Sequence, residues 1–325
     1  MEKRNRIGEL DFFKGIAIIL VVVGHVIQRN WEGALDNHPV YTWIYSFHMP
    51  LFFFISGYLI NHTFGKKDIG SCLKKKVLAL LLPYFVWCYL IAPFVNRESL
   101  PSIFYILTDT DSRYWFVYLL FYYSVFYYIG QYIRNGLSGV LGGAFLIISV
   151  FAILQYVFPC EISSRGLQFL PLYLLGVVSS TFKLNEKTSL YKEPFLSLAI
   201  LVFMVTSLKY CQVDISLMSK VCKFLASFSI CYIVLYFING SFISLDNNLV
   251  KMIMYIGKNS IVIYLTHFFF IKILPTPIVE DLSPYPFWAL ILSIIAASVI
   301  IPTCLIIGKI AEYFKWINRF VYGRY

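Results

Sequence analysis

The sequence predicts an all-α polytopic membrane protein, a bundle of about ten transmembrane helices with both termini in the cytoplasm. Three observations lead to this prediction. Hydrophobic residues make up 59% of the 325 positions and charged residues only 14%, a balance that soluble domains do not show. Apolar runs of about twenty residues, each long enough to cross a bilayer, recur along the whole chain. Most Lys and Arg residues fall in alternate loops between these runs, which indicates the orientation.

The predicted spans follow one another with short connections. They cover residues 8–28, 41–61, 77–96, 114–133, 137–158, 166–182, 194–210, 222–243, 252–274 and 286–308. No long polar linker interrupts them, so we expect a single membrane domain over residues 1–325. Residues 309–325 alternate aromatic and basic side chains, which is typical of an amphipathic cytoplasmic tail that lies against membrane lipids.

The net charge of +10 suggests nucleic acid as a partner at first sight. The basic residues are spread over alternate loops, however, as the positive-inside rule expects of a membrane protein. We therefore expect no nucleic-acid partner. The seven cysteines include no CxxC pair and no metal-ligand spacing, so their pattern indicates no metal site.

The first apolar segment, residues 6–27, carries the ionisable side chains Asp11, Lys14 and His25 along its length. On a helix, Lys14 and His25 lie roughly 20° apart around the axis and about 16 Å apart along it. Asp11 lies about 40° from His25 on the same side. Ionisable groups within a span are costly and suggest function, so this polar stripe should face a protein-lined cavity. Since Asp11 precedes Lys14 by three residues, we expect Asp11 to pair with that lysine or to cap local structure rather than to do chemistry.

Three of the five histidines are expected in the outer half of the bilayer. They are His25 in the first predicted span, His48 in the second and His267 in the ninth. A lone buried histidine usually makes a structural hydrogen bond to a neighbouring helix. Three histidines at one depth favour a site instead. Zinc is the rival interpretation, but no histidine pair has helical ligand spacing and no carboxylate lies near them within a span.

A basic stretch between the second and third predicted spans ends in Lys74, Lys75 and Lys76. These lysines act as a topology signal and as a contact for anionic lipids in one interpretation. In the other interpretation they form a binding site for a phosphorylated cytosolic molecule. The sequence leaves both interpretations open.

Six segments of the chain resemble, in the same order, the integral-membrane acyltransferase-3 family, which includes bacterial O-acetyltransferases that modify surface polysaccharides. They are LDFFKGIAIILVVVGH (Leu10–His25), FHMPLFFFISGYL (Phe47–Leu59), KKKVLALLLPY (Lys74–Tyr84), the pair Trp115–Phe116, FLPLYLLG (Phe169–Gly176) and GKNSIVIYLTH (Gly257–His267). The resemblance covers nearly the full length, and its first two segments together are quite specific.

This resemblance implies a multi-pass protein of the bacterial cytoplasmic membrane, with acyl-CoA, usually acetyl-CoA, as the cytoplasmic donor. It implies a hydroxyl acceptor on a glycan or lipid-linked sugar at the outer side, and it makes Lys14 and His25 essential. The family often carries two basic residues, three apart, before the proline of the third span. Aligned on Pro83, the first matches Lys76 but the second falls on Ala79. Lys74 or Lys75 is the expected substitute.

The resemblance and the residues together favour an enzyme, an O-acyltransferase. Lys14, Lys74, Lys75 and Lys76 would bind the phosphates of the donor, and no metal is expected. His25 would act as general base or take the acyl group itself, and the sequence leaves both routes open. His48 and His267 would orient His25 or bind the acceptor. The candidates for the oxyanion stabiliser are Tyr45, Ser56, Trp115 and Tyr264.

Two other classes of function remain open. Polar residues at mid-depth in ten spans would also suit a transporter or flippase for a glycan or lipid-linked precursor. Against transport, the sequence shows no inverted repeat and no paired broken helices in matching halves. A binding or regulatory protein descended from the enzymes is the third class, and the only feature that suggests it is Ala79.

Overall fold

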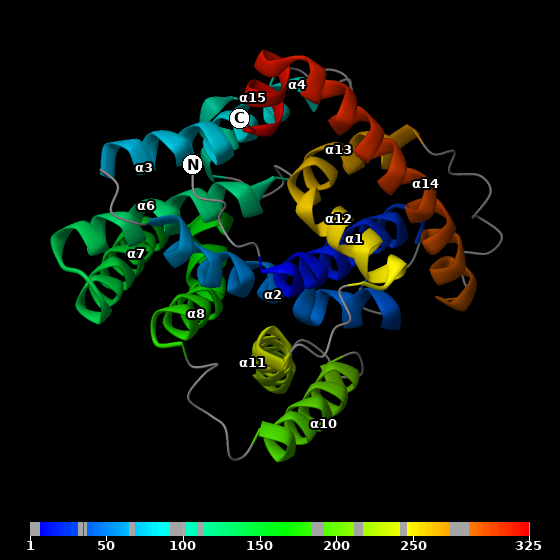
Figure 1. Ribbon diagram of the computed structural model, residues 1–325, viewed down its shortest axis with the longest axis horizontal. Coiled ribbons are helices and arrows are strands. Elements are labelled where there is room, and N and C mark those ends of the chain that lie inside the picture. The colour runs from blue at the N-terminus through cyan, green and yellow to red at the C-terminus, as the bar shows by residue number, and fades with distance from the viewer. Residues whose placement is uncertain are drawn as a thin grey trace. The chain divides into compact units, whose positions relative to one another are not determined.

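Every regular element that the computed structural model describes is a helix (Figure 1). The described residues are 7–31, 35, 38–64, 69–91, 100, 102–108, 114–183, 192–210, 217–240, 246–273 and 286–324. They divide into two units. Unit 1 comprises Met1–Phe52 and Asn185–Ile307, and unit 2 comprises Phe53–Leu184 and Gly308–Tyr325.

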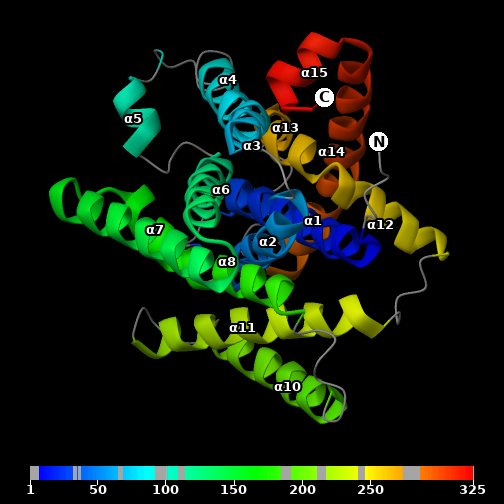
Figure 2. The same cartoon turned by 60° about the vertical axis from the view of Figure 1, so that its left-hand side comes forward.

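Unit 1 is built around helix α1 (Gly8–Asn30), an apolar helix whose buried side chains are mostly Val, Ile and Ala. It packs against α12 (Asn248–Lys258), α13 (Ser260–Ile273) and α11 (Leu217–Gly240). Helix α10 (Lys192–Tyr210) runs beside α11, as Figures 1 and 2 both show. The first half of α2 (Pro39–Phe64) joins this unit through Phe47, which packs on Phe203 and Ala226.

Unit 2 contains α6 (Trp115–Ile133), α7 (Leu137–Val157) and α8 (Glu161–Thr181), which pack on one another. A short helix, α5 (Ile103–Thr108), contacts α8. The second half of α2 lies directly against α8, because a Cβ atom on Gly57 or on Gly176 would fall about 2 Å from a backbone oxygen of the other helix. Near the end of α2, Tyr127 of α6 donates to Asn61, and Asn61 donates to Thr181 of α8 at 2.6 Å.

Five of the described helices are long and apolar enough to cross a membrane, and a bent pair makes a sixth candidate. The five are Gly8–Asn30, Pro39–Asn61, Leu137–Val157, Leu217–Ile238 and Phe287–Tyr313. The chain is therefore an all-α, multi-pass membrane protein, and the count of ten spans stays a prediction. Helices α6, α8 and α10 also form where spans are predicted, but they are not among the five. Tyrosines lower the hydropathy of α6, charged residues lower that of α8, and the apolar part of α10, Glu193–Leu208, is shorter.

The ninth predicted span, residues 252–274, is wrong as one continuous helix. The structure breaks it into α12 and α13, which meet at an angle of 79°. Asn259 causes the break: its side-chain amide donates to the Tyr255 carbonyl at 2.8 Å and ends α12. The Asn259 carbonyl then accepts from Val262 at 3.0 Å and starts α13. Depth in the membrane therefore cannot be counted along one axis from residue 252.

The third predicted span begins inside a longer helical stretch. Helix α3 (Ile69–Lys76) passes into a π-helical segment, η2 (Val77–Leu81), and then into α4 (Leu82–Ile91). Pro83 has no N–H, so it cannot donate to the Ala79 carbonyl as an α-helix would require. The preceding N–H, that of Leu82, donates to the Val77 carbonyl five residues earlier, which is the π-helical pattern.

The predicted tail from residue 309 onward begins later than expected. Helix α14 (Pro286–Tyr313) runs four residues past Lys309 before the chain turns at Phe314 into α15 (Lys315–Tyr322). Helix α15 is amphipathic, with Trp316 exposed and Tyr322 buried. It packs against α4 and η2 of the same unit.

Candidate active site

The polar stripe of α1 begins with an ion pair. Lys14 Nζ lies 2.5 Å from Asp11 Oδ1, as the spacing of three residues predicts. The Asp11 side chain is 12% exposed and that of Lys14 20%, so the pair is largely shielded from solvent. Shielding makes the pairing structurally necessary, since an isolated buried charge is costly.

Two glycines bring α12 against this pair. A Cβ atom on Gly257 would lie 1.8 Å from the Asp11 carbonyl oxygen, and one on Gly15 would lie 2.1 Å from the Ile253 carbonyl oxygen. Helix backbones approach each other this closely only where a small residue such as glycine stands at the point of contact. The glycines therefore set the position of Asp11 and Lys14 relative to α12.

His25 lies near the other end of the same helix, with its ring half-buried. Its Nδ1 atom is 2.9 Å from Gln28 Oε1 and 3.3 Å from the Tyr45 hydroxyl. An amide oxygen only accepts hydrogen bonds, so Nδ1 carries the proton in this arrangement. The other ring nitrogen, Nε2, then holds a lone pair and can accept a proton from a substrate.

His267 lies beside His25, as expected for two histidines at one depth. Their ring centroids are 5.4 Å apart, and Phe268 packs on both rings at 4.4 Å from His25 and 4.3 Å from His267. His267 is fully buried, and its Nδ1 bonds to the Ile263 carbonyl one turn earlier at 2.9 Å. Tyr264 is buried beside it, with ring centroids 6.1 Å apart. The packing of His267 and Phe268 against His25 orients the imidazole of His25.

His48 reaches the cluster through Tyr45. The Tyr45 ring packs edge-on against His48 at 4.6 Å, while its hydroxyl contacts His25. His48 is 2% exposed and its Nδ1 bonds to the Ile44 carbonyl at 2.7 Å. This geometry suits a positioning role for His48 better than direct contact with a substrate.

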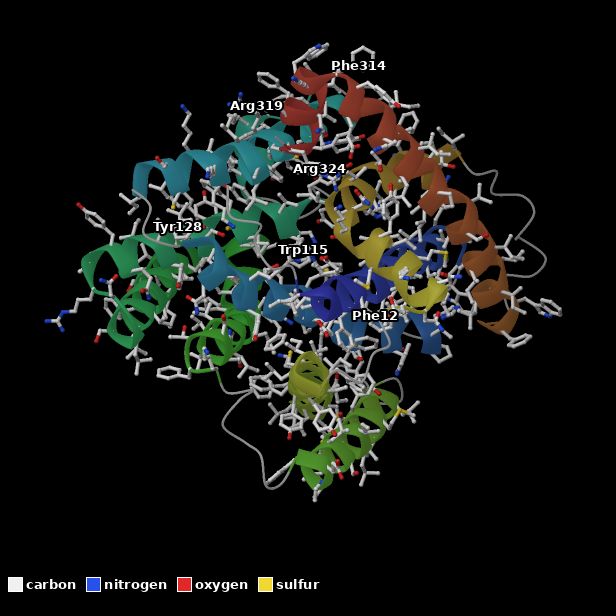
Figure 3. The ribbon with its side chains drawn as sticks, in the orientation of Figure 1. Phe12, Trp115, Tyr128, Phe314, Arg319 and Arg324 are labelled. Atoms are coloured by element: carbon white, nitrogen blue, oxygen red, sulfur yellow. The ribbon has the colours of Figure 1, made fainter. Side chains whose placement is uncertain are left out.

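The remaining predicted site residues lie in unit 2. Ser56 is half-buried on the second half of α2. Trp115 begins α6, stacks on Phe169 at 5.5 Å and has the Arg165 guanidinium 4.8 Å above its ring (Figure 3). Lys74, Lys75 and Lys76 form the last turn of α3, the first two exposed and the third half-buried.

Sequence reasoning missed three residues of this cluster. Gln28 stands three residues after His25, and that spacing alone is a signal that both share a helix face. Phe268 directly follows His267 and gave no signal beyond its apolar character. Lys223 of α11 lies within electrostatic range of His48, with its Nζ 5.7 Å from the Tyr210 ring. Only the fold reveals that Lys223 and His48 lie on neighbouring helices.

A further histidine, His38, precedes α2 and is fully buried beside the Trp31 ring. Its Nδ1 accepts the Tyr41 N–H at 3.2 Å, which satisfies a donor in the first turn of α2. Burial lowers the pKa of His38 from its ordinary value of 6.5, so the folded protein favours the neutral ring.

We expect the stability of the protein to fall as the pH drops below about 6.5, because the unfolded chain protonates His38 more readily than the folded chain. Thermal unfolding midpoints of the purified protein between about pH 8 and pH 5 measure this effect. The control is His38→Asn, which accepts the same N–H but does not titrate. An equally steep pH dependence in wild type and His38→Asn would disprove the role of His38.

The family profile described as an acyltransferase domain matches residues 7–307. The chain belongs to the acyltransferase-3 family. The match includes the ion pair of α1 and the cluster around His25.

Three curated proteins are similar to this acyltransferase-3 chain. The nodulation protein NolL of Mesorhizobium japonicum is 29% identical over 171 residues, 48% of this chain and 46% of that protein. NolL of Sinorhizobium fredii is 30% identical over 171 residues, 48% of this chain and 47% of that protein. The inner membrane protein YcfT of Escherichia coli is 35% identical over 80 residues, 21% of this chain and 22% of that protein. The chain thus spans about half the length of the NolL proteins. No solved structure matches it.

Proposed function

We propose that the protein is a membrane O-acyltransferase that moves an acyl group, acetyl in the first instance, from cytoplasmic acetyl-CoA to a hydroxyl of an extracytoplasmic or lipid-linked glycan. The observation that carries the proposal is the half-buried His25, whose Nδ1 faces Gln28 and Tyr45 while its ring packs against His267 and Phe268. An imidazole held in one tautomer is what a general base requires. Membership of the acyltransferase-3 family supports the reaction type.

In the proposed reaction, His25 Nε2 takes the proton of the acceptor hydroxyl. The acceptor oxygen attacks the thioester carbonyl carbon, a C–O bond forms and the C–S bond breaks. The coenzyme A thiolate leaves and takes up the proton from the imidazolium. Tyr45, whose hydroxyl lies 3.3 Å from His25 Nδ1, is one candidate stabiliser for the negative charge on the carbonyl oxygen. Ser56, Trp115 and Tyr264 remain the other candidates.

Lys14 and the three lysines of α3 are the proposed donor-binding residues. Lys14 lies eleven residues before His25 on α1, about 16 Å along the helix axis. A donor whose phosphates stay near one membrane surface therefore needs an extended arm to bring its thioester to His25. The pantetheine arm of coenzyme A supplies such an extension.

The orientation that we propose places both termini and the lysines of α3 in the cytoplasm, in a bundle of about ten spans. His25 then lies toward the outer surface, where a secreted or lipid-linked glycan is available. The name of the Escherichia coli relative, an inner membrane protein, supports the bacterial cytoplasmic membrane as the location.

The test of the proposed function is transfer from radiolabelled acetyl-CoA by the purified, detergent-solubilised protein, with mixed surface glycans as acceptors. Label that appears in glycan, or slow thioester hydrolysis, supports the proposal when it requires His25. Turnover that is absent with every acyl-CoA tried would reject it.

Lys14→Ala is expected to raise the apparent KM for acetyl-CoA by about tenfold with a smaller change in kcat, because a charge-assisted contact to donor phosphate is lost. Initial rates over a range of acetyl-CoA concentrations measure both constants. Asp11→Asn is the companion variant, since it removes the ion-pair partner at 2.5 Å but keeps the lysine charge. A Lys14→Ala protein with wild-type KM would contradict the donor-binding role.

Transport is the second candidate, and the 79° break between α12 and α13 favours it. Transporters often bind substrates at broken helices within the membrane. Glycan flux across vesicles that contain the protein but no acyl-CoA would support this alternative. Label transfer without such flux would leave the enzyme as the explanation.

A further inference from the structure

The C-terminal helix α15 is fastened to α4 by specific contacts within unit 2. The Trp87 indole N–H donates to the Val321 carbonyl at 2.8 Å. Tyr322 is 3% exposed, and its ring lies 6.1 Å from that of Trp87. A helix that only rested on lipid would not bury a tyrosine against the protein. These contacts fix the end of α15 relative to α4 and η2.

The chain leaves α15 through Gly323, which lies against Ala79 of η2. A Cβ atom on Gly323 would be 2.5 Å from the Ala79 carbonyl oxygen and 2.6 Å from its Cα atom. Gly323 also has a φ of +64°, a conformation that other residues adopt only with strain. Both the contact and the backbone conformation therefore require glycine here.

Arg324 follows Gly323 and is held in place by its neighbours. Its N–H donates to the Asn318 carbonyl at 3.2 Å, and its Nη1 atom lies 3.6 Å from Glu312 Oε1. Its side chain is 22% exposed, whereas Arg319 on α15 is exposed (Figure 3). The two arginines thus differ in setting: one is packed against the protein, and the other faces outward.

Lys76 stands three residues before Ala79, about one helical turn away. The contact between Gly323 and Ala79 therefore brings Arg324 to the turn that follows Lys74, Lys75 and Lys76. Arginine binds phosphate through a planar fork of N–H donors, and lysine binds it as a point charge.

We infer that Arg324 completes a phosphate-binding site with Lys76, and that this site holds the nucleotide phosphates of the acyl donor. The inference rests on the proposed function, because it assigns a further residue to the donor site of that reaction. The partly buried setting of Arg324 favours a soluble donor over lipid headgroups, for which the outward-facing Arg319 is better placed.

The test is binding of radiolabelled acetyl-CoA to the full chain in neutral phosphatidylcholine nanodiscs. Arg324→Ala is expected to weaken binding about tenfold, and the charge-matched control Arg319→Ala to leave it unchanged. Gly323→Ala keeps every charge but displaces Arg324, so it should weaken binding as well. Acetyl-pantetheine, which has no phosphate, should bind equally to wild type and to Arg324→Ala. Thermal unfolding of each variant establishes that it is folded.

The outcomes separate this site from the proposed function. Wild-type binding of acetyl-CoA that Arg324→Ala leaves unchanged would overturn the site alone. Equal losses in Arg324→Ala and Arg319→Ala would overturn it too, because they indicate general attraction by positive charge. A loss that appears only in nanodiscs containing anionic phosphatidylglycerol would assign Arg324 to lipid headgroups instead. No binding of acetyl-CoA by wild type would overturn both the site and the proposed donor.

Discussion

Replacing His25 with alanine is expected to lower acyl transfer about 10²- to 10⁴-fold, the usual contribution of a general base. The reason is the geometry of the ring: Nδ1 faces the Gln28 oxygen at 2.9 Å, so Nε2 is the atom that accepts the proton. Initial rates of label transfer from acetyl-CoA to glycan measure the loss. Donor binding, measured separately, should stay near the wild-type level, because the proposed mechanism brings His25 to the thioester rather than to the phosphates.

The control for this loss is His38→Asn, which alters another buried histidine of the same unit that lies outside the His25 cluster. At neutral pH this variant should transfer acyl groups at the wild-type rate. Full activity in His25→Ala would refute the proposed mechanism, and equal losses in both variants would point to a general defect in folding.

Substitutions of Gln28 test whether this residue sets the tautomer of His25. Gln28→Leu removes the oxygen that holds the proton on Nδ1, so we expect a loss of about tenfold, from a mixture of tautomers. Gln28→Glu keeps an acceptor oxygen at that place and should retain most of the rate. If Gln28→Leu and Gln28→Glu behaved alike, Gln28 would not set the tautomer of His25.

The sequence predicted the parts of the site that depend on helical periodicity. Asp11 and Lys14 pair because they stand three residues apart, and the stripe from Lys14 to His25 follows from the repeat of the helix. The approach of His267 to His25 agrees with the expected common depth, although the span that was to carry His267 is broken at Asn259. Local rules carry this information because each α-helix repeats regularly along its own sequence.

Helical periodicity does not predict contacts between segments that are distant in the sequence. The polar side chain of Asn259 can end a helix or sit within one, and its tertiary setting decides which. The resemblance to the family implies that Ala79 stands where a second basic residue is common, but it does not predict that Gly323 packs against Ala79. Likewise, Lys223 and His48 come onto neighbouring helices only through the packing of α11 on α2. Periodicity identifies a face of a helix, whereas its partner depends on the whole fold.

Gly257→Ala is expected to destabilise the protein by about 1–3 kcal/mol and to impair donor binding. The added Cβ atom would lie 1.8 Å from the Asp11 carbonyl oxygen and 2.6 Å from the Gly15 nitrogen, so α1 and α12 must separate. Backbone atoms cannot rotate out of the way as a side chain can. Separation moves Asp11 and Lys14, which lie on the facing turn of α1. Thermal unfolding and the KM for acetyl-CoA measure the two effects.

The same substitution at Gly142 of α7 provides the matched control, because a Cβ atom there would meet nothing within 4 Å. Alanine favours the helix over glycine by roughly 0.5–1 kcal/mol, so Gly142→Ala should be neutral or slightly stabilising. The two variants add one identical methyl group, and only the distance to a neighbouring backbone differs between them. Equal stability of Gly257→Ala and Gly142→Ala would show that α1 and α12 do not meet through their glycines. A Gly257→Ala protein that is destabilised but keeps its KM would show that the position of Lys14 does not depend on this contact.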